Sequence, residues 1–215
     1  MKRVIIVGAN EIEDTSFIKK EKDRGSFLVA CDGGYRCFMK ENIIPDLFVG
    51  DYDTFKEKDL VTAKNIISLN TIKDDTDVFY AIKKLIKENY KEFHLYGCLG
   101  GKIEHTIANI QLLYFLINHN CKGYLYSSDN RTIVHMIKNS CIRLNPINAL
   151  HFSVFSYNKL ALGVSETGFK YEINDITLRN DTPLGVSNEF VGKEGIISVK
   201  DGILLLVLPI ESVCL

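Results

Sequence analysis

The sequence of 215 residues lacks the features that direct a chain to a membrane or to nucleic acid. No apolar run approaches the roughly 20 residues of a membrane-spanning helix, and the run at 4–7 is too short for a signal peptide. A formal net charge of -1 provides no broad basic field for nucleic acid or an anionic membrane. We therefore expect a soluble, cytoplasmic protein whose partners are small molecules or proteins.

The cysteine and histidine spacings that mark zinc sites are also missing. Six cysteines are scattered without a C-x-x-C pair, and several lie inside apolar runs, as buried thiols of a reducing compartment do. Five histidines show neither HExxH nor another ligand spacing. We expect no zinc site.

Short apolar runs alternate with helix-like segments over residues 1–130. The expected strands are 4–9, 27–31, 47–49, 66–68, 93–96 and 123–127, and the expected helices are 19–24, 35–42, 55–63, a segment from Val78 capped by Asp75 or Thr76, and 104–119. This alternation predicts an α/β domain with a mostly parallel sheet, covered by helices, that binds ligands at the carboxyl ends of its strands.

Residues 131–215 follow a different pattern, with short alternating segments separated by turn signals such as Asn145-Pro146 and Asp201-Gly202. The expected strands are 133–137, 150–155, 160–162, 169–173, 196–199 and 204–208. This pattern predicts an antiparallel β-sandwich appended to the α/β domain.

Aspartates gather at the predicted carboxyl edge of the parallel sheet: Asp32, Asp51, Asp53, Asp74, Asp75 and Asp77. In GDYDT, residues 50–54, Asp51 and Asp53 are two positions apart and project to the same side if the chain is extended. Carboxylates around one crevice repel each other unless a cation is present, and Mg²⁺ takes oxygen ligands while leaving sites for phosphates. A polar turn after a buried strand remains the alternative, because Gly and Asp are ordinary turn formers.

Two familiar ion and phosphate motifs do not fit. GDYDT does not begin an EF-hand, since Lys56 stands where that loop requires glycine. The loop from Gly97 to Lys102 is one residue too short for a Walker A motif, and Ile103 follows its lysine. What remains is a glycine-rich turn before a helix, which can meet phosphate oxygens or be a plain βα turn.

Three further pairs leave both a structural and a functional interpretation open. His105 and Asn109 share a helix face at i and i+4, Phe169 and Tyr171 share a face of a predicted strand, and Ser187-Asn188 follows a predicted turn.

Taken together, these residues resemble the thiamine pyrophosphokinase family over nearly the whole chain. The resemblance lies in the order and spacing of Asp32-Gly33-Gly34, Pro45-Asp46 leading into GDYDT, Lys73-Asp74-x-Thr76-Asp77, Gly100-Gly101-Lys102-x-Glu104-His105 with Asn109, and Ser187-Asn188. Members of that family make thiamine diphosphate and AMP from thiamine and ATP, and work as homodimers.

The resemblance assigns roles to individual residues. It implies that Asp51, Asp53 and Asp77 hold Mg²⁺ and act in catalysis with Lys102. ATP would be bound by Asp32, Gly33, Gly34, Lys73, Asp74, Thr76, Gly100, Gly101, Lys102 and His105, and thiamine by Tyr171, Ser187, Asn188 and Asn109. Residues 1–130 would then be the catalytic domain, and 131–215 the thiamine-binding and dimerisation domain, with thiamine at the subunit interface.

The chain departs from the family pattern at several positions. Lys102 and Glu104 stand where the family usually has arginine and aspartate, and Thr54 stands where it has serine. Lysine keeps the charge but loses the bidentate fork of arginine. Phe79 replaces a frequent acidic residue, and Tyr171 lies where some members have tryptophan.

Two alternative functions remain open. One is a non-catalytic nucleotide or thiamine sensor, and the other is a metal-dependent nucleotide phosphohydrolase.

Overall fold

The computed structural model describes residues 2–70 and 74–214. Its chain divides into two compact units, Met1–Asn130 and Arg131–Leu215. Each unit has its own core of buried apolar side chains. Val4–Val7 belong to the core of the first unit, and Leu204 and Leu206 belong to that of the second.

The first unit is built on a parallel sheet. Its strands are β1 Arg3–Val7, β2 Phe27–Cys31, β3 Leu47–Gly50, β4 Ile66–Ser68, β5 Glu92–Tyr96 and β6 Lys122–Tyr126. They lie in the order β6-β5-β1-β2-β3-β4, and the pairings between these neighbours run parallel. β1 reads as a continuous apolar run because both faces of this central strand are covered.

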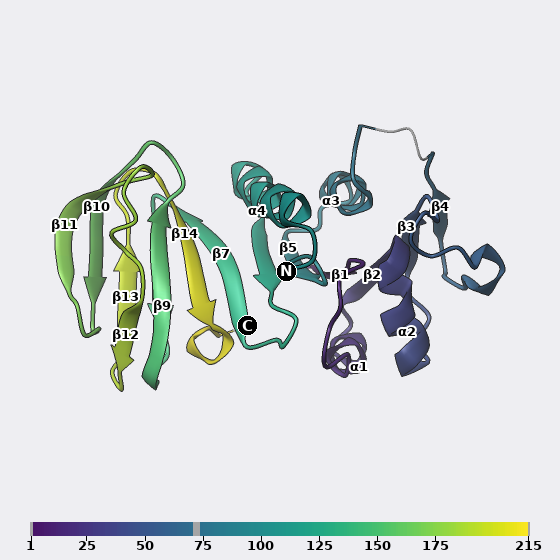
Figure 1. Ribbon diagram of the computed structural model, residues 1–215, viewed down its shortest axis with the longest axis horizontal. Helices are drawn as coiled ribbons and strands as arrows, with labels where there is room; N and C mark the ends of the chain where they lie inside the picture. The colour runs from purple at the N-terminus through teal and green to yellow at the C-terminus, as the bar shows by residue number, and fades with distance from the viewer. Residues whose placement is uncertain (1, 71–73, 215) are drawn as a thin grey trace. The chain divides into compact units, whose positions relative to one another are not determined.

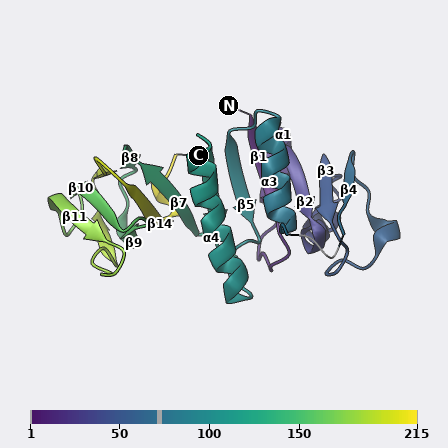
Figure 2. The same cartoon turned by 90° about the horizontal axis from the view of Figure 1, so that it is seen from above.

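Helices cover both faces of this sheet, as the sequence predicts. They are α1 Phe17–Asp23, α2 Tyr35–Glu41, α3 Asp77–Lys87 and α4 Ile103–Asn118. Figure 1 shows α1 and α2 on one face and α3 and α4 on the other, and Figure 2 shows α3 and α4 lying over their face from above. α3 begins where predicted, because the Thr76 side chain accepts a hydrogen bond from the Phe79 amide at 3.2 Å. Within 2–70 and 74–214, no helix has both the length and the apolar character of a membrane span.

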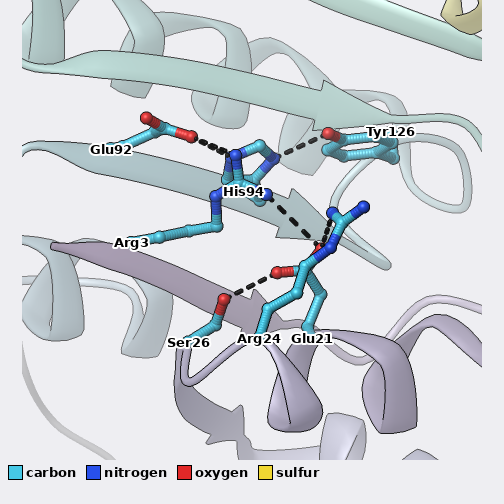
Figure 3. A network of polar contacts seen from close by, with 7 residues as sticks. All are labelled: Arg3, Glu21, Arg24, Ser26, Glu92, His94 and Tyr126. Atoms are coloured by element: carbon cyan, nitrogen blue, oxygen red, sulfur yellow. Dashed lines mark hydrogen bonds and ion pairs between the residues drawn. The ribbon is translucent and has the colours of Figure 1, made fainter. Parts of the chain in front are cut away.

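A buried polar network ties β1, β5 and β6 to α1 (Figure 3). Nε2 of His94 lies 2.9 Å from Oε1 of Glu92, and Nδ1 lies 2.6 Å from the Tyr126 hydroxyl. Because a carboxylate only accepts, Nε2 carries the proton, and Nδ1 accepts from Tyr126. Arg3 joins the network through an ion pair with Glu92 at 2.8 Å.

Glu21 extends the network towards β2. It accepts hydrogen bonds from Ser26 at 2.6 Å and from Arg24 at 2.9 Å, and lies 3.5 Å from Arg3. The hydrogen bond from His94 and the charge of Arg3 lower the pKa of Glu92 to about 2. Burial lowers the pKa of His94 below its ordinary value, so the buried imidazole is neutral at neutral pH.

The second unit is an antiparallel β-sandwich, so the predicted fold class is confirmed for both halves. Its strands are β7 Thr132–Lys138, β8 Cys141–Leu144, β9 Asn148–Ser156, β10 Leu160–Thr167, β11 Ile173–Arg179, β12 Asn188–Val191, β13 Gly195–Ser198 and β14 Ile203–Pro209. One sheet has the order β12-β9-β14-β7 and the other β11-β10-β13-β8. Phe152, Phe169 and Phe190 pack together at one end, with ring centroids 4.4 to 5.3 Å apart.

The helix predicted over 55–63 is wrong. Only a 3-10 turn, η2 Lys58–Leu60, forms there. Phe55 is the one buried residue of the segment, so no second apolar side chain at helical spacing anchors it to the core. The loop is instead held by the Tyr35 hydroxyl, which accepts from the Thr62 amide at 2.7 Å.

The strand predicted over 169–173 is also wrong. β11 begins only at Ile173, and the preceding residues form a loop that starts at Gly168 with φ +83°. Phe169 is buried and Tyr171 is 61% exposed, so the two aromatic residues do not share a buried face. The prediction also omitted β8 and β12, which have only four residues each.

Neutral His94 predicts a specific acid sensitivity. Its folded pKa lies below the unfolded value of about 6.5, so the unfolded state takes up the proton first and stability falls as pH drops below about 6.5. Urea denaturation at pH 7.5 and 5.5 should show a loss for the parent protein, at most about 1.4 kcal/mol per pH unit from this group. His94→Gln should be less stable than the parent at pH 7.5 but lose less between the two pH values.

His119→Gln, which changes an exposed imidazole of the same unit, is the control and should behave like the parent. Glu92 does not contribute in this range, because its stabilisation is lost only as pH falls from about 4.5 towards 2. An undiminished pH dependence in His94→Gln would show that His94 is not the group responsible.

Candidate active site

Three carboxylates meet at the carboxyl ends of β2 and β3. One ligand oxygen from each of Asp32, Asp51 and Asp53 lies within 4.8 Å of the others. Asp32 directly follows β2 and is 3% exposed, whereas Asp53 is exposed after β3. The set offers only oxygen donors and has an open side, which fits a hard divalent cation such as Mg²⁺ that retains sites for phosphate.

Asp32 also holds the loop that carries the other two carboxylates. Its Oδ2 accepts from the Thr54 amide at 2.8 Å, and its Oδ1 accepts from the Phe55 amide at 3.4 Å. Burial raises the pKa of the Asp32 carboxyl above its ordinary value and Asp53 raises it further, while the two amides act in the opposite direction. Asp32 is therefore both an anchor and a member of the acidic cluster.

The GDYDT loop has a tight turn at Tyr52, with φ +66°. The Asp53 amide donates to Oδ1 of Asp51 at 3.2 Å, and the Thr54 hydroxyl donates to Oδ1 of Asp53 at 2.9 Å. From α2, Arg36 donates to the Thr54 carbonyl at 2.7 Å and lies over the Phe55 ring. These contacts fix the direction of both carboxylates before any ligand binds.

Close backbone packing explains the two glycines after Asp32. A Cβ on Gly34 would lie 2.0 Å from the Val7 carbonyl oxygen, and one on Gly33 would lie 2.8 Å from the Thr54 methyl and 3.0 Å from Cβ of Ala9. Larger residues would therefore separate the loops after β1, β2 and β3. The glycines bring the end of β1 against the acidic cluster.

Asn10, in the loop after β1, connects this edge to the glycine-rich loop after β5. Its Nδ2 donates to the carbonyls of Leu99 and Gly100 at 3.3 and 3.0 Å. Thr106 exchanges hydrogen bonds with the backbone of Gly100 at 3.1 Å, and Nδ2 of Asn109 donates to the Cys98 carbonyl at 2.7 Å. The Gly100 amide is held by the Thr106 hydroxyl, so within the described residues it is the later amides of the loop, with the exposed Lys102, that can face an anion.

The remaining predicted ATP and metal residues are distributed as follows. Asp77 is the first residue of α3 and is not in the cluster of three carboxylates, while Lys73 lies outside the described residues. His105 is exposed on α4. Asp74 and Thr76 line a cavity of about 460 Å³ between α3 and α4, whose walls include Phe79 and Phe115.

Asn109 has a structural position rather than an open one. It is 9% exposed and its amide holds the Cys98 carbonyl, so the structural interpretation of the His105 and Asn109 pair fits Asn109. The sequence reasoning missed Asn10, Arg36 and Thr106. Arg36 and Thr106 lie within six residues of a glycine motif, whereas Asn10 lies near none. The partners of Asn10 and Arg36 come from other loops, so sequence spacing could not identify these two residues.

In the second unit, the three predicted thiamine residues lie near one another. Tyr171 is exposed in the loop before β11, and its backbone N–H and C=O both bond to the Asn188 side chain at 3.1 and 2.8 Å. Ser187, with φ +60°, is exposed just before β12. Asn188 itself is buried.

Two family models match most of the chain. "Thiamin pyrophosphokinase, catalytic domain" matches residues 18–125, and "Thiamin pyrophosphokinase, vitamin B1 binding domain" matches residues 140–204. Thiamine pyrophosphokinase of Bacillus subtilis is 25% identical over 189 residues, which are 86% of this chain and 88% of the relative.

Solved structures share the fold. The crystal structure of thiamine pyrophosphokinase from Bacillus subtilis superposes with a TM-score of 0.83 at 22% identity, covering 97% of this chain and 99% of that one. Thiamin pyrophosphokinase from Candida albicans gives a TM-score of 0.78 at 16% identity, covering 96% and 88%.

The α/β unit with its acidic and glycine-rich loops, together with these matches, defines an enzyme of the kinase class. The chain belongs to the thiamin pyrophosphokinase family. The family named by the sequence motifs is thereby confirmed.

The different environments of Asn109 and His105 predict different effects of their removal. Asn109→Ala leaves the buried Cys98 carbonyl without its side-chain donor and should lower the free energy of unfolding by about 1–3 kcal/mol. His105→Ala, four residues earlier in the exposed first turn of α4, should change it by less than about 0.5 kcal/mol. Urea denaturation measures both, and equal stability of the two variants would contradict a structural role for Asn109.

Proposed function

We propose that the protein transfers the pyrophosphoryl group of ATP to the hydroxyl of thiamine, forming thiamine diphosphate and AMP. The observation that carries this proposal is the acidic cluster of Asp32, Asp51 and Asp53, joined through the β1 loop to the glycine-rich loop after β5. Family membership supports the choice of thiamine as the acceptor.

In this proposal, Asp51 and Asp53 hold Mg²⁺ beside Asp32, and Asp77 remains the further predicted ligand. Bound Mg²⁺ would neutralise charge on the ATP phosphates. Lys102 and the loop amides after Gly100 would bind the phosphate oxygens, with Lys73 and His105 as predicted contributors. The support is the oxygen-only donor set and the way hydrogen bonds already orient it.

The transfer exchanges one P–O bond for another. The thiamine hydroxyl oxygen bonds to the β-phosphorus of ATP, and the bond from this phosphorus to the α,β-bridging oxygen breaks. AMP leaves with that electron pair, and the hydroxyl proton is released to solvent. Catalysis of this kind depends on alignment and on charge neutralisation more than on covalent chemistry by the protein. The hydrogen-bonded GDYDT loop supplies alignment without rearrangement.

We propose that the first unit binds ATP and Mg²⁺ and that the second binds thiamine and dimerises. Thiamine would lie at the interface of a cytoplasmic homodimer. Tyr171, Leu184 and Val186 are exposed apolar side chains of the second unit near Ser187, and they favour such contacts.

The activity is tested with purified protein, thiamine, ATP and Mg²⁺. AMP and thiamine diphosphate should form in equal amounts, measured by chromatography. ADP as product would exclude pyrophosphoryl transfer. Phosphate release without thiamine would identify a nucleotide phosphohydrolase, and ligand binding without turnover would identify a sensor.

Asp53→Asn tests the acidic cluster. The exchange keeps the size of the side chain but removes a charged metal ligand, so kcat should fall by at least about a hundredfold while the thermal transition stays close to that of the parent. Calorimetry should also show weaker Mg²⁺ binding. The control is Asp59→Asn, an exposed aspartate on η2 outside the cluster, which should keep activity and Mg²⁺ affinity. Full activity in Asp53→Asn would refute the metal assignment.

A further inference from the structure

A carboxyl group lies in the interior of the β-sandwich without a cation. Glu166, on β10, is 3% exposed, and β10 pairs on both sides, with β11 and β13. Within the described residues, no lysine, arginine or histidine forms an ion pair with it. An unpaired buried carboxyl lowers stability, and such local conflicts with folding concentrate at functional sites.

Asn188 is the hydrogen-bonding partner of Glu166. It begins β12 in the facing sheet, and its Nδ2 donates to Oε2 of Glu166 at 2.7 Å and to the Tyr171 carbonyl at 2.8 Å. Its Oδ1 accepts from the amides of Tyr171 and Glu189 at 3.1 and 2.8 Å. An asparagine side chain has two N–H donors and two lone pairs, so Asn188 has no capacity left for a ligand.

Glu166, in contrast, can accept a further hydrogen bond. Oε2 accepts from Asn188, whereas Oε1 receives no hydrogen bond from the residues that the structure describes. Burial raises the pKa of this carboxyl, and the hydrogen bond from Asn188 only partly offsets the shift. The same asparagine connects Glu166 to the backbone of Tyr171, whose ring is exposed.

The matched vitamin B1 binding region, residues 140–204, contains all three residues. Thiamine carries an aminopyrimidine ring, whose exocyclic amino group donates hydrogen bonds, and a positively charged thiazolium ring. A fixed carboxyl oxygen complements the amino group, and an exposed tyrosine ring offers a face for stacking. A phosphate or another anion would be repelled by the same carboxylate.

We propose that Glu166, rather than Asn188, recognises the aminopyrimidine of thiamine, through a hydrogen bond from the amino group to Oε1. Asn188 is then a positioning residue that holds both the carboxyl and the Tyr171 loop. This inference rests on the proposed function, since it takes thiamine as the substrate.

The test compares thiamine with oxythiamine, in which an oxygen acceptor replaces the amino donor. Calorimetry on the full chain gives the ratio of the two dissociation constants. The parent should prefer thiamine, and Glu166→Gln should reduce that preference roughly tenfold to a hundredfold, since an amide can turn its N–H₂ towards the oxo group and a charged acceptor is lost. Glu194→Gln, an exposed glutamate of the same unit, is the control and should leave the ratio unchanged.

A purely structural role would weaken both ligands equally, so an unchanged ratio in Glu166→Gln overturns the inference, as does a parent without preference for thiamine. If Glu166→Gln does not fold, Glu166→Asp, which withdraws the carboxyl by one methylene, is judged by the same ratio. Failure of the proposed function is distinct: the parent would then form no thiamine diphosphate. A parent that forms it, with a ratio insensitive to Glu166, refutes this inference alone.

Discussion

The site depends on the buried carboxylate of Asp32 more than on any other group. By accepting hydrogen bonds from the amides of Thr54 and Phe55, it joins the loop after β2 to the loop after β3. The same bonds place its oxygens beside those of Asp51 and Asp53. Three carboxylates this close repel one another, so a cation bound between them would be stabilised electrostatically. A carboxylate whose sole role was to bind a metal ion would not also hold the loop that carries Asp51 and Asp53.

Glycine extends this constraint across the sheet edge. Gly33 and Gly34 allow the loops after β1 and β2 to touch, and Asn10 then reaches the glycine-rich loop after β5. Gly101 is part of the same arrangement, because a Cβ there would lie 2.5 Å from Oδ1 of Asn10, and its φ is +65°. The acidic and glycine-rich loops are therefore linked by direct contact. We infer that a substitution at Asn10 would disturb both the acidic loop and the glycine-rich loop.

Periodicity predicted the strands and helices of the first unit well, because buried parallel strands such as β1 are continuous apolar runs and α3 carries a cap at Thr76. It failed at 55–63, where the apolar residues lack a second buried anchor, and at 169–173, where the side chain of Asn188 satisfies the backbone that a strand partner would otherwise bond. Proximity of Asp32 to GDYDT followed from topology. The hydrogen bonds from Asn10 and Arg36 did not, since they join segments 18 to 90 residues apart.

The β-sandwich shows why a motif position and a ligand-binding atom need not coincide. A sequence pattern selects Asn188, yet every donor and acceptor of that amide is already used to hold Tyr171, Glu189 and Glu166. An asparagine in this state can be indispensable to binding without touching the ligand, because its loss would release the Tyr171 loop and leave a buried carboxyl without a donor. The oxygen with spare capacity belongs to Glu166, from the opposite sheet, 22 residues away in sequence. The free acceptor on Glu166 is therefore the basis for proposing it as the recognition group, which residue spacing does not suggest.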